Sequence, residues 1–252
     1  MDTVYSVDTL ASVEERAVND LLQLIQERHS ARVPFDQNRT VPKTELLQIE
    51  EAARWSPTAH NMQNFEIVIV DDRELLDQIG AIRVRISEEF VREHAQLLSF
   101  SEEELRRRKV GLLASMLPPW IRGPGTAEKV TEEMPLHRLM AGCPVLMVVL
   151  YDATKRAPAS EGDVLGMMSL GCVLQSMWLM AHSLRIGFQA LSVLSAPPVE
   201  QAVQDLLAVP AHMKVGFAVR LGHPVTSVPY LRVRREVAEF THWNHFGNRP
   251  TR

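Results

Sequence analysis

The chain has 252 residues, 46% of them hydrophobic, and a formal net charge of −4. At this length roughly 70–75% of the extended-chain surface can be buried, so a large core is possible without disulfides. The acidic balance argues against a protein that coats nucleic acid, and two cysteines in apolar runs indicate buried thiols in a reducing cytoplasm. The N-terminus shows neither the basic start nor the apolar core of a signal peptide, so a cytoplasmic location is expected.

A first helix is predicted from Ser12, where Glu15 completes a capping box, to about Arg28. Its apolar residues share one face: Val18, Leu21, Leu22 and Ile25. Pro42 suits the first turn of a second helix that runs to about Trp55.

Residues 65–70 are predicted to form a buried strand, since residues 67–70 show no polar alternation, and Asp71 or Asp72 can cap the next helix. Further along, the pattern predicts strands at 143–151, 188–194 and 214–221 and a helix at 197–207. Helices between strands fit a doubly wound sheet as well as an α+β fold, and periodicity does not decide between them. Since no repeat or linker interrupts the chain, one domain is predicted over residues 1–252, with an extension at about 1–12.

Residues 95–140 form a lid-like insertion in this interpretation. Ser101 and Glu104 open a charged helix, and several prolines and glycines break regular structure after it. The basic run 106–109 follows the acidic run 102–104, which is typical of a solvated helix with i,i+4 ion pairs and not of a nucleic-acid surface. Trp120 belongs either to a lid or to the core.

Residues 164–184 contain no charged side chain and are long enough to span a bilayer. Serine, glutamine and histidine side chains are spread along this segment and are costly in lipid. We therefore expect a central helix that is buried on all sides and can lie at a subunit interface, with no membrane association.

Common catalytic signatures are missing from the sequence. It contains no P-loop, HExxH, CxxC or GxSxG pattern, and no GxGxxG follows a predicted strand. The histidines form no metal-ligand spacing with the cysteines or carboxylates, so no metal site is predicted.

Two short segments carry the remaining chemical signal. In residues 28–36, Arg28 and Arg32 flank Ser30, so the segment can bind a phosphate through charge-assisted bonds; ordinary basic residues at a helix end are the alternative. Residues 52–65 place small and amide side chains between a helix and a strand, which suits a flat heteroaromatic ligand but also an ordinary polar connection.

Taken in order, these segments resemble the N-terminal signature of the nitroreductase family. The likeness runs from Arg28-x-Ser30-x-Arg32 through Pro42 and residues 52–57 to Asn61-x-Gln63. In the C-terminal half, residues 175–187, 219–224 and 234–243 are similar to later parts of the family pattern, so the likeness covers most of residues 20–246.

The resemblance implies an α+β fold with a mainly antiparallel sheet and an intertwined homodimer with two FMN sites at its interface. It places Arg28 and Ser30, with His29 beside them, near the FMN phosphate and ribityl chain, and Arg32 at the pyrimidine edge. A guanidinium at that edge stabilises the negative charge of the reduced flavin.

The resemblance assigns the remaining flavin contacts as follows. Pro57, Thr58, Ala59 and Asn61 contact the flavin from the partner subunit. Ser192 or Leu191 offers a backbone N–H to the flavin N5, and Arg235, with Arg234 as the alternative, completes the phosphate site.

Three positions depart from the family pattern. Asn64 stands where proline is usual, and Ala59 and His60 replace a commoner serine or glycine, which puts the substrate face in doubt more than the flavin site. His60 is a candidate proton donor to substrate, with a polar rim residue as the alternative.

The activity implied is an FMN-dependent NAD(P)H oxidoreductase. NADH or NADPH passes hydride to the flavin N5, and an electron-poor acceptor such as a nitroaromatic or a quinone then takes the same space, in a ping-pong sequence. Three rivals stay open: another flavin reaction on the same fold (dehydrogenation, reductive dehalogenation or flavin destruction), a non-catalytic flavin-binding protein, and a membrane-anchored protein.

Overall fold

A computed structural model describes residues 18–85, 87–111, 133–158, 160, 162, 164–227 and 230–249. The chain divides into two compact units, the first made of residues 1–84 and 135–225 and the second of residues 85–134 and 226–252. One domain over the whole chain stays a prediction. Ser12, Glu15 and Trp120 lie outside the described residues.

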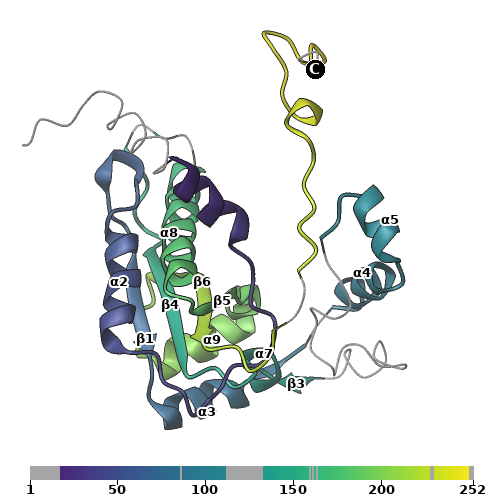
Figure 1. Ribbon diagram of the computed structural model, residues 1–252. Helices are drawn as coiled ribbons and strands as arrows, with labels where there is room; N and C mark the ends of the chain where they lie inside the picture. The colour runs from purple at the N-terminus through teal and green to yellow at the C-terminus, as the bar shows by residue number, and fades with distance from the viewer. Residues whose placement is uncertain are drawn as a thin grey trace, which may run out of the picture. The chain divides into compact units, whose positions relative to one another are not determined.

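The first unit is built on a four-stranded sheet in the order β1-β4-β6-β5 (Figure 1). Its strands are β1 (Glu66–Val70), β4 (Val145–Asp152), β5 (Gly187–Ala190) and β6 (Met213–Gly222). All three strand pairs are antiparallel. The antiparallel pairing decides the question that the sequence left open, and the fold is α+β.

Helices and short turns surround this sheet. They are the helix at residues 18–27, α2 (Lys43–Arg54), η1 (Ala59–Asn61), α3 (Arg73–Ala81), α7 (His137–Met140), α8 (Val164–Ser183), η4 (Ser192–Ser195) and α9 (Pro197–Leu206). A second, two-stranded sheet joins β2 (Arg83–Val84) with β3 (Met134–Pro135). Pro42 is predicted in the first turn of the second helix and instead directly precedes α2 as its N-cap residue. The predicted cap of α3 is confirmed, because the Asp72 carboxylate accepts a hydrogen bond from the Leu75 N–H at 2.8 Å.

The main core lies where α2 and α8 pack against one face of the sheet. Its members alternate along the central strands, with Val145, Met147 and Val149 of β4 facing the two helices. From the helices, Ile49 and Val173 reach 0% exposure. This layer sets the position of α8, to which both parts of the candidate site attach.

The second unit contains α4 (Glu88–Leu98), α5 (Glu102–Arg107) and η5 (Val237–Glu239). The Ser101 hydroxyl caps α5 by accepting from the Glu104 N–H, as predicted. The predicted ion pairs are also present, and Arg107 and Arg108 lower the pKa of Glu104 to about 2. These charges pair with one another on an exposed helix.

Two predictions about secondary structure and burial need correction. The strand predicted at 188–194 ends at Ala190, because its ladder with β6 stops at Val219 and the chain turns into η4. The helix α8 is not buried on all sides within one chain: Val164 and Met168 are 64% and 61% exposed. By length and composition, it is the one helix among the described residues that could cross a membrane.

The ring of Phe35 packs closely against the backbone of the sheet. Gly187 of β5 and Gly222 of β6 are register partners, and the Phe35 ring lies on both. A Cβ built on Gly187 would meet Phe35 Cε1 at 2.6 Å. Glycine is therefore required at this position by the approach of the ring.

The Gly187→Ala substitution is expected to destabilise the protein by about 1–3 kcal/mol, because the added methyl group forces the Phe35 ring out of its place. Urea unfolding measures the loss. The loss should shrink in a Phe35→Leu background, where the ring atoms that clash are missing. Equal losses in the two backgrounds would contradict this packing.

Candidate functional site

Within the segment from Arg28 to Phe35, residues 31–35 alternate between buried and accessible side chains. Ala31, Val33 and Phe35 are only 1%, 6% and 3% exposed. Arg32 and Pro34 lie between them and keep part of their surface accessible, as do Arg28, His29 and Ser30 before them. The predicted ligand-binding residues are therefore all partly accessible, as binding a ligand requires.

Arg28 and His29 lie against the C-terminal half of α8. The Arg28 guanidinium carbon lies 4.2 Å from the centre of the Trp178 ring, a cation–π contact. The Trp178 Nε1–H donates to the His29 carbonyl at 3.1 Å. The His29 ring meets the His182 ring edge-on, with centroids 5.5 Å apart. These contacts fix the positions of Arg28 and His29, two of the predicted flavin-binding residues, directly after the first helix.

Behind the same segment lies Arg220 of β6, which is 1% exposed. Its Nη2 donates to the carbonyls of Ala31 and Val33, both at 2.8 Å. Its Nε donates to Gln189 Oε1 at 2.8 Å and its Nη1 to the Met140 carbonyl at 3.3 Å. The sequence analysis missed this residue, although a single arginine inside the apolar run 215–221 was a visible signal.

The loop predicted to cover the flavin has an unusual backbone. His60, Asn61 and Gln63 have φ values of 50°, 53° and 47°. Such values are uncommon outside glycine and cluster at functional sites. Two hydroxyls hold the loop in this shape: Thr58 Oγ1 accepts from the Gln63 N–H at 3.1 Å, and Ser169 Oγ accepts from the Ala59 N–H at 2.9 Å.

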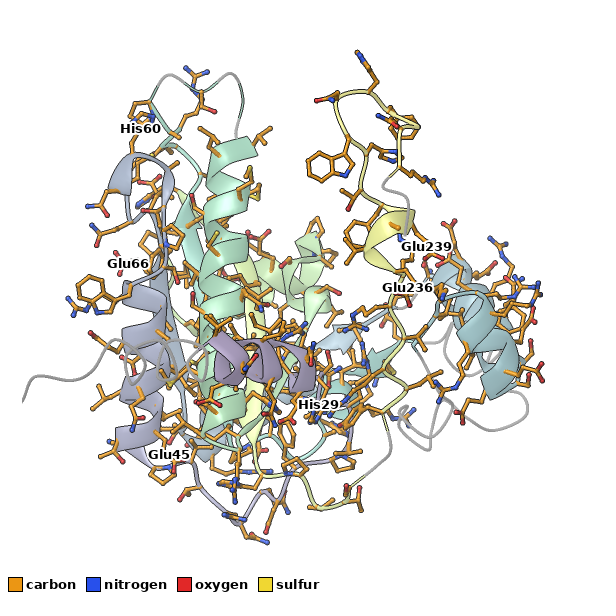
Figure 2. The ribbon with its side chains drawn as sticks, turned by 45° about the horizontal axis from the view of Figure 1, so that its top comes forward. His29, Glu45, His60, Glu66, Glu236 and Glu239 are labelled. Carbon is orange, nitrogen blue, oxygen red and sulfur yellow. The ribbon has the colours of Figure 1, made fainter. Side chains whose placement is uncertain are left out.

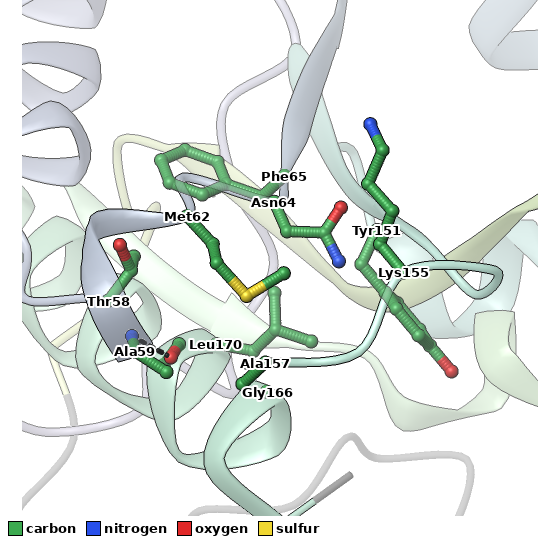
Figure 3. A pocket seen from close by; sticks show the side chains of 11 residues that line it. Thr58, Ala59, Met62, Asn64, Phe65, Tyr151, Lys155, Ala157, Gly166 and Leu170 are labelled. Carbon is green, nitrogen blue, oxygen red and sulfur yellow. Dashed lines mark hydrogen bonds between the residues drawn. The ribbon is translucent and has the colours of Figure 1, made fainter. Parts of the chain in front are cut away.

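Figure 3 shows a small cavity between this loop, the end of β4 and the start of α8. Its volume is about 20 Å³, enough for roughly one water molecule and not for a substrate. Its lining includes Thr58, Ala59, Tyr151, Lys155 and Ser169. The cavity therefore belongs to the support of the loop.

Asn64, which replaces the proline usual in the family pattern, has a structural role in this fold. Its amide nitrogen donates to the Asp152 carbonyl at 3.1 Å, and its oxygen accepts from the Asp152 N–H at 3.3 Å. The Asp152 carboxylate accepts from the Thr154 N–H and pairs with Lys155 at 3.2 Å. The Thr154 hydroxyl contributes most to lowering the pKa of Asp152 to about 2. Asn64 thus fastens the loop to β4.

The two predicted half-sites lie at opposite ends of α8. Ala59 is hydrogen-bonded to Ser169 near its start, and the His29 ring meets the His182 ring edge-on near its end. At a rise of about 1.5 Å per residue, these two attachment points are roughly 20 Å apart. Figure 2 shows His60 and His29 correspondingly far from each other. Within one chain the two segments are further apart than a flavin ring is wide.

The two candidate donors to a flavin N5 are in different environments. The Leu191 N–H donates to the Ala218 carbonyl at 2.8 Å, and the side chain is 5% exposed. Ser192 is exposed and begins the turn η4. Because the Leu191 N–H is engaged in the sheet, Ser192 is the better candidate.

The two C-terminal arginines belong to the second unit. Arg234 Nη1 donates to the Val233 carbonyl at 2.7 Å, and the Arg235 guanidinium lies 5.4 Å from the Phe240 ring centre. Both side chains are exposed. Arg234 is turned back on its own backbone, which favours Arg235 as the residue available to a ligand.

A larger hollow, of about 350 Å³, lies between α3, α7 and the start of β4. Arg73, Asp77 and His137 contribute to its polar lining, and Cys143 also lines it. Burial raises the pKa of the Cys143 thiol to about 11, so the thiol stays protonated and inert at neutral pH. No group of three potential metal ligands occurs within the described part of the chain.

The nitroreductase family model matches residues 25–223. That range contains the segment at 28–35, the loop at 57–63 and Ser192, but not Arg234 and Arg235. A curated relative, the oxygen-insensitive NADPH nitroreductase of Helicobacter pylori, is 44% identical over 59 residues, which are 23% of this chain and 28% of the relative. The matched part thus spans little more than a quarter of that relative.

Solved structures resemble nearly the whole chain in fold. The nitroreductase of Bacteroides fragilis, solved with bound FMN, is 19% identical with a TM-score of 0.55, covering 87% of this chain and 96% of that one. The nitroreductase of Desulfitobacterium hafniense, also solved with bound FMN, is 20% identical with a TM-score of 0.55, covering 89% and 97%. The family match over most of the chain, together with this fold, shows that the protein belongs to the nitroreductase family.

Proposed function

We propose that the protein is a cytoplasmic FMN-dependent oxidoreductase that uses NADH or NADPH to reduce an electron-poor small molecule. The observation that carries this proposal is the segment at residues 28–35. Its residues Ala31, Val33 and Phe35 are buried in the core, while Arg28, Ser30 and Arg32 keep part of their surface accessible. FMN-bound relatives of the same fold support the choice of cofactor.

The donor set fits FMN in its chemistry. A phosphate dianion needs guanidinium and hydroxyl donors, which Arg28 and Ser30 offer. The family resemblance implies Arg235 as a further guanidinium. Arg32, two residues after Ser30, faces the pyrimidine edge in this proposal. Ser192 offers a backbone N–H at the reacting edge.

Arg28→Ala and Arg235→Ala are each expected to weaken FMN binding by roughly 10- to 100-fold, since each removes charge-assisted bonds worth about 1.5–3 kcal/mol. Titration of flavin-stripped protein with FMN, followed by quenching of flavin fluorescence, measures the change. Arg106→Ala is the matched control, because Arg106 pairs with Glu102 on an exposed helix. Unchanged FMN affinity in both variants would remove the assignment of the phosphate site.

The position of the loop at 57–61 supports a site shared between two copies of the chain. One chain holds its two half-sites at opposite ends of α8, roughly 20 Å apart. A twofold axis perpendicular to α8 would pack the two copies of the helix antiparallel and bring the start of one to the end of the other. Pro57, Thr58, Ala59 and Asn61 would then cover the flavin of the partner, as the family resemblance implies.

Exposed apolar side chains mark the surface available for this pairing. They are Val18, Leu21, Leu22 and Ile25 of the first helix and Val164, Leu165, Met167 and Met168 of α8. In the second unit, taken by itself, the C-terminal segment exposes Val237, Phe240, Trp243 and Phe246 to 50–93%. Patches of this kind are typical of protein interfaces, and an extended segment rich in them suits an intertwined dimer.

Met168→Glu is expected to convert a dimer into a monomer and to lower the bound flavin content, because it places a charge on the proposed interface. Light scattering after gel filtration and the visible spectrum of the same sample measure both effects. Leu206→Glu on α9 is the control, since Leu206 is also exposed, at 37%, and lies outside the proposed interface.

A flavin-containing wild-type monomer would contradict the shared site. A wild-type protein that needs detergent for extraction would instead favour the membrane-anchored alternative for α8.

When bound, FMN supplies the redox chemistry by accepting a hydride at N5 and passing it to an acceptor. The residues of the chain hold the ring in place and stabilise its charge, and Arg32 favours the reduced anionic form. His60 is exposed on the covering loop, so it can reach a substrate as a proton donor or line the rim of the site. Because donor and acceptor use the same space over the ring, we propose a ping-pong mechanism.

Initial rates measured at several NAD(P)H and acceptor concentrations should give parallel double-reciprocal lines with a nitroaromatic or a quinone. Purified protein should show the visible spectrum of a flavin that either nicotinamide bleaches. Bound flavin that neither nicotinamide reduces would point to a flavin-binding protein without catalysis. Reduction without turnover of either acceptor would point to another flavin reaction on this fold.

A further inference from the structure

The structure assigns a positioning role to Arg220: we infer that its buried guanidinium sets the conformation of the segment at residues 28–35 and thereby the phosphate selectivity of flavin binding. This inference rests on the proposed function, because it concerns the same flavin site. Arg220 belongs to β6 and lies behind the segment, where it is 1% exposed. It acts through the backbone of other residues and is no catalytic residue.

Two hydrogen bonds from Arg220 fix the backbone conformation of the segment. One nitrogen, Nη2, binds the carbonyls of Ala31 and Val33, two residues apart and both at 2.8 Å. One nitrogen can reach both oxygens only if they lie closer together than the roughly 6.6 Å that separates every second residue of an extended strand. The backbone bends at Val33, and the pair of bonds holds this bend, with Ala31 and Val33 buried and Ser30 and Arg32 partly accessible.

The guanidinium itself is held from two further sides. Gln189, the register partner of Arg220 on β5, accepts from Nε at 2.8 Å, and the Met140 carbonyl accepts from Nη1 at 3.3 Å. The Phe35 ring lies over the guanidinium carbon at 4.1 Å. Gln189 and Met140, which lie outside the segment, thus fix the guanidinium together with the Phe35 ring at the end of the segment.

The chemistry of arginine explains why this position needs that residue. A guanidinium is planar and offers donors in fixed directions, so one side chain can bind Gln189 and two neighbouring carbonyls together. A lysine ammonium keeps the positive charge but lacks the planar set of N–H donors. The Arg220→Lys variant therefore tests whether the segment needs this donor geometry or only the positive charge.

The experiment compares FMN with riboflavin, which lacks the phosphate, as ligands of flavin-stripped full-length protein. Wild type is expected to bind FMN more tightly, and Arg220→Lys should reduce that preference by about 10-fold because Arg28 and Ser30 are no longer aligned. Gln189→Leu, which removes only the acceptor for Nε, should reduce it by a smaller factor. A loss of global stability alone would weaken both ligands equally and leave the preference unchanged.

Val148→Ala is the matched control. Val148 is a fully buried residue of β4, so its truncation lowers stability, yet it makes none of the bonds that hold the segment. Urea unfolding should show the stability loss of this variant, with the wild-type preference for FMN over riboflavin retained.

Hydrogen exchange, measured without flavin, tests directly whether Arg220 holds the segment in place. The Ala31 N–H donates to the Phe188 carbonyl and the Phe35 N–H to the Ala141 carbonyl. Hydrogen exchange at these two amides should be faster in Arg220→Lys, whereas exchange in the β1 and β4 ladder should stay as in wild type.

The outcomes separate the two proposals. Wild type that binds FMN over riboflavin, with the same preference in Arg220→Lys and Gln189→Leu, overturns the role of Arg220 and leaves the flavin site intact. Wild type that binds neither ligand overturns the flavin site. Unchanged exchange at Ala31 and Phe35 in Arg220→Lys overturns the role of Arg220 in holding the segment, whatever the flavin result.

Discussion

The separation of the two half-sites by the length of α8 is the constraint on which the functional geometry depends. Ser169 holds the strained loop at one end of the helix, and Trp178 and His182 hold Arg28 and His29 at the other. One face of α8 packs on α2 and the sheet, so the helix cannot bend to bring its ends together. A second copy of the chain is the simplest source of the missing half.

The buried guanidinium of Arg220 is costly to place in a core, because removal of a charge from water costs several kcal/mol. Hydrophobic residues would stabilise this position at least as well. What an apolar side chain cannot supply is a directed set of donors that orders an irregular segment. The charge is thus better explained by the conformation it specifies than by the stability it contributes.

Local features of the fold could be predicted from the sequence, and relations between distant segments could not. Pro42, Asp72 and Ser101 mark helix starts because caps act over a few residues. The direction of the strands, the end of the β5 ladder at Ala190 and the bonds of Arg220 depend on pairing between segments far apart in the chain. The segment at 28–35 combines both cases. Its residue types indicate a ligand, but only the fold shows that Ala31, Val33 and Phe35 are the buried ones.

The backbone of the covering loop fits a role in binding better than a role in folding. Three non-glycine residues with positive φ are unfavourable, by about 1–3 kcal/mol for the least tolerant of them. The bonds to Thr58 and Ser169 hold this shape, yet Asn61 and Gln63 remain exposed within the chain. A conformation held at a cost, with its polar groups turned outward, is what a surface prepared for a ligand on another subunit requires. The strain, the exposed apolar face of α8 and the length of that helix therefore point to the same shared site.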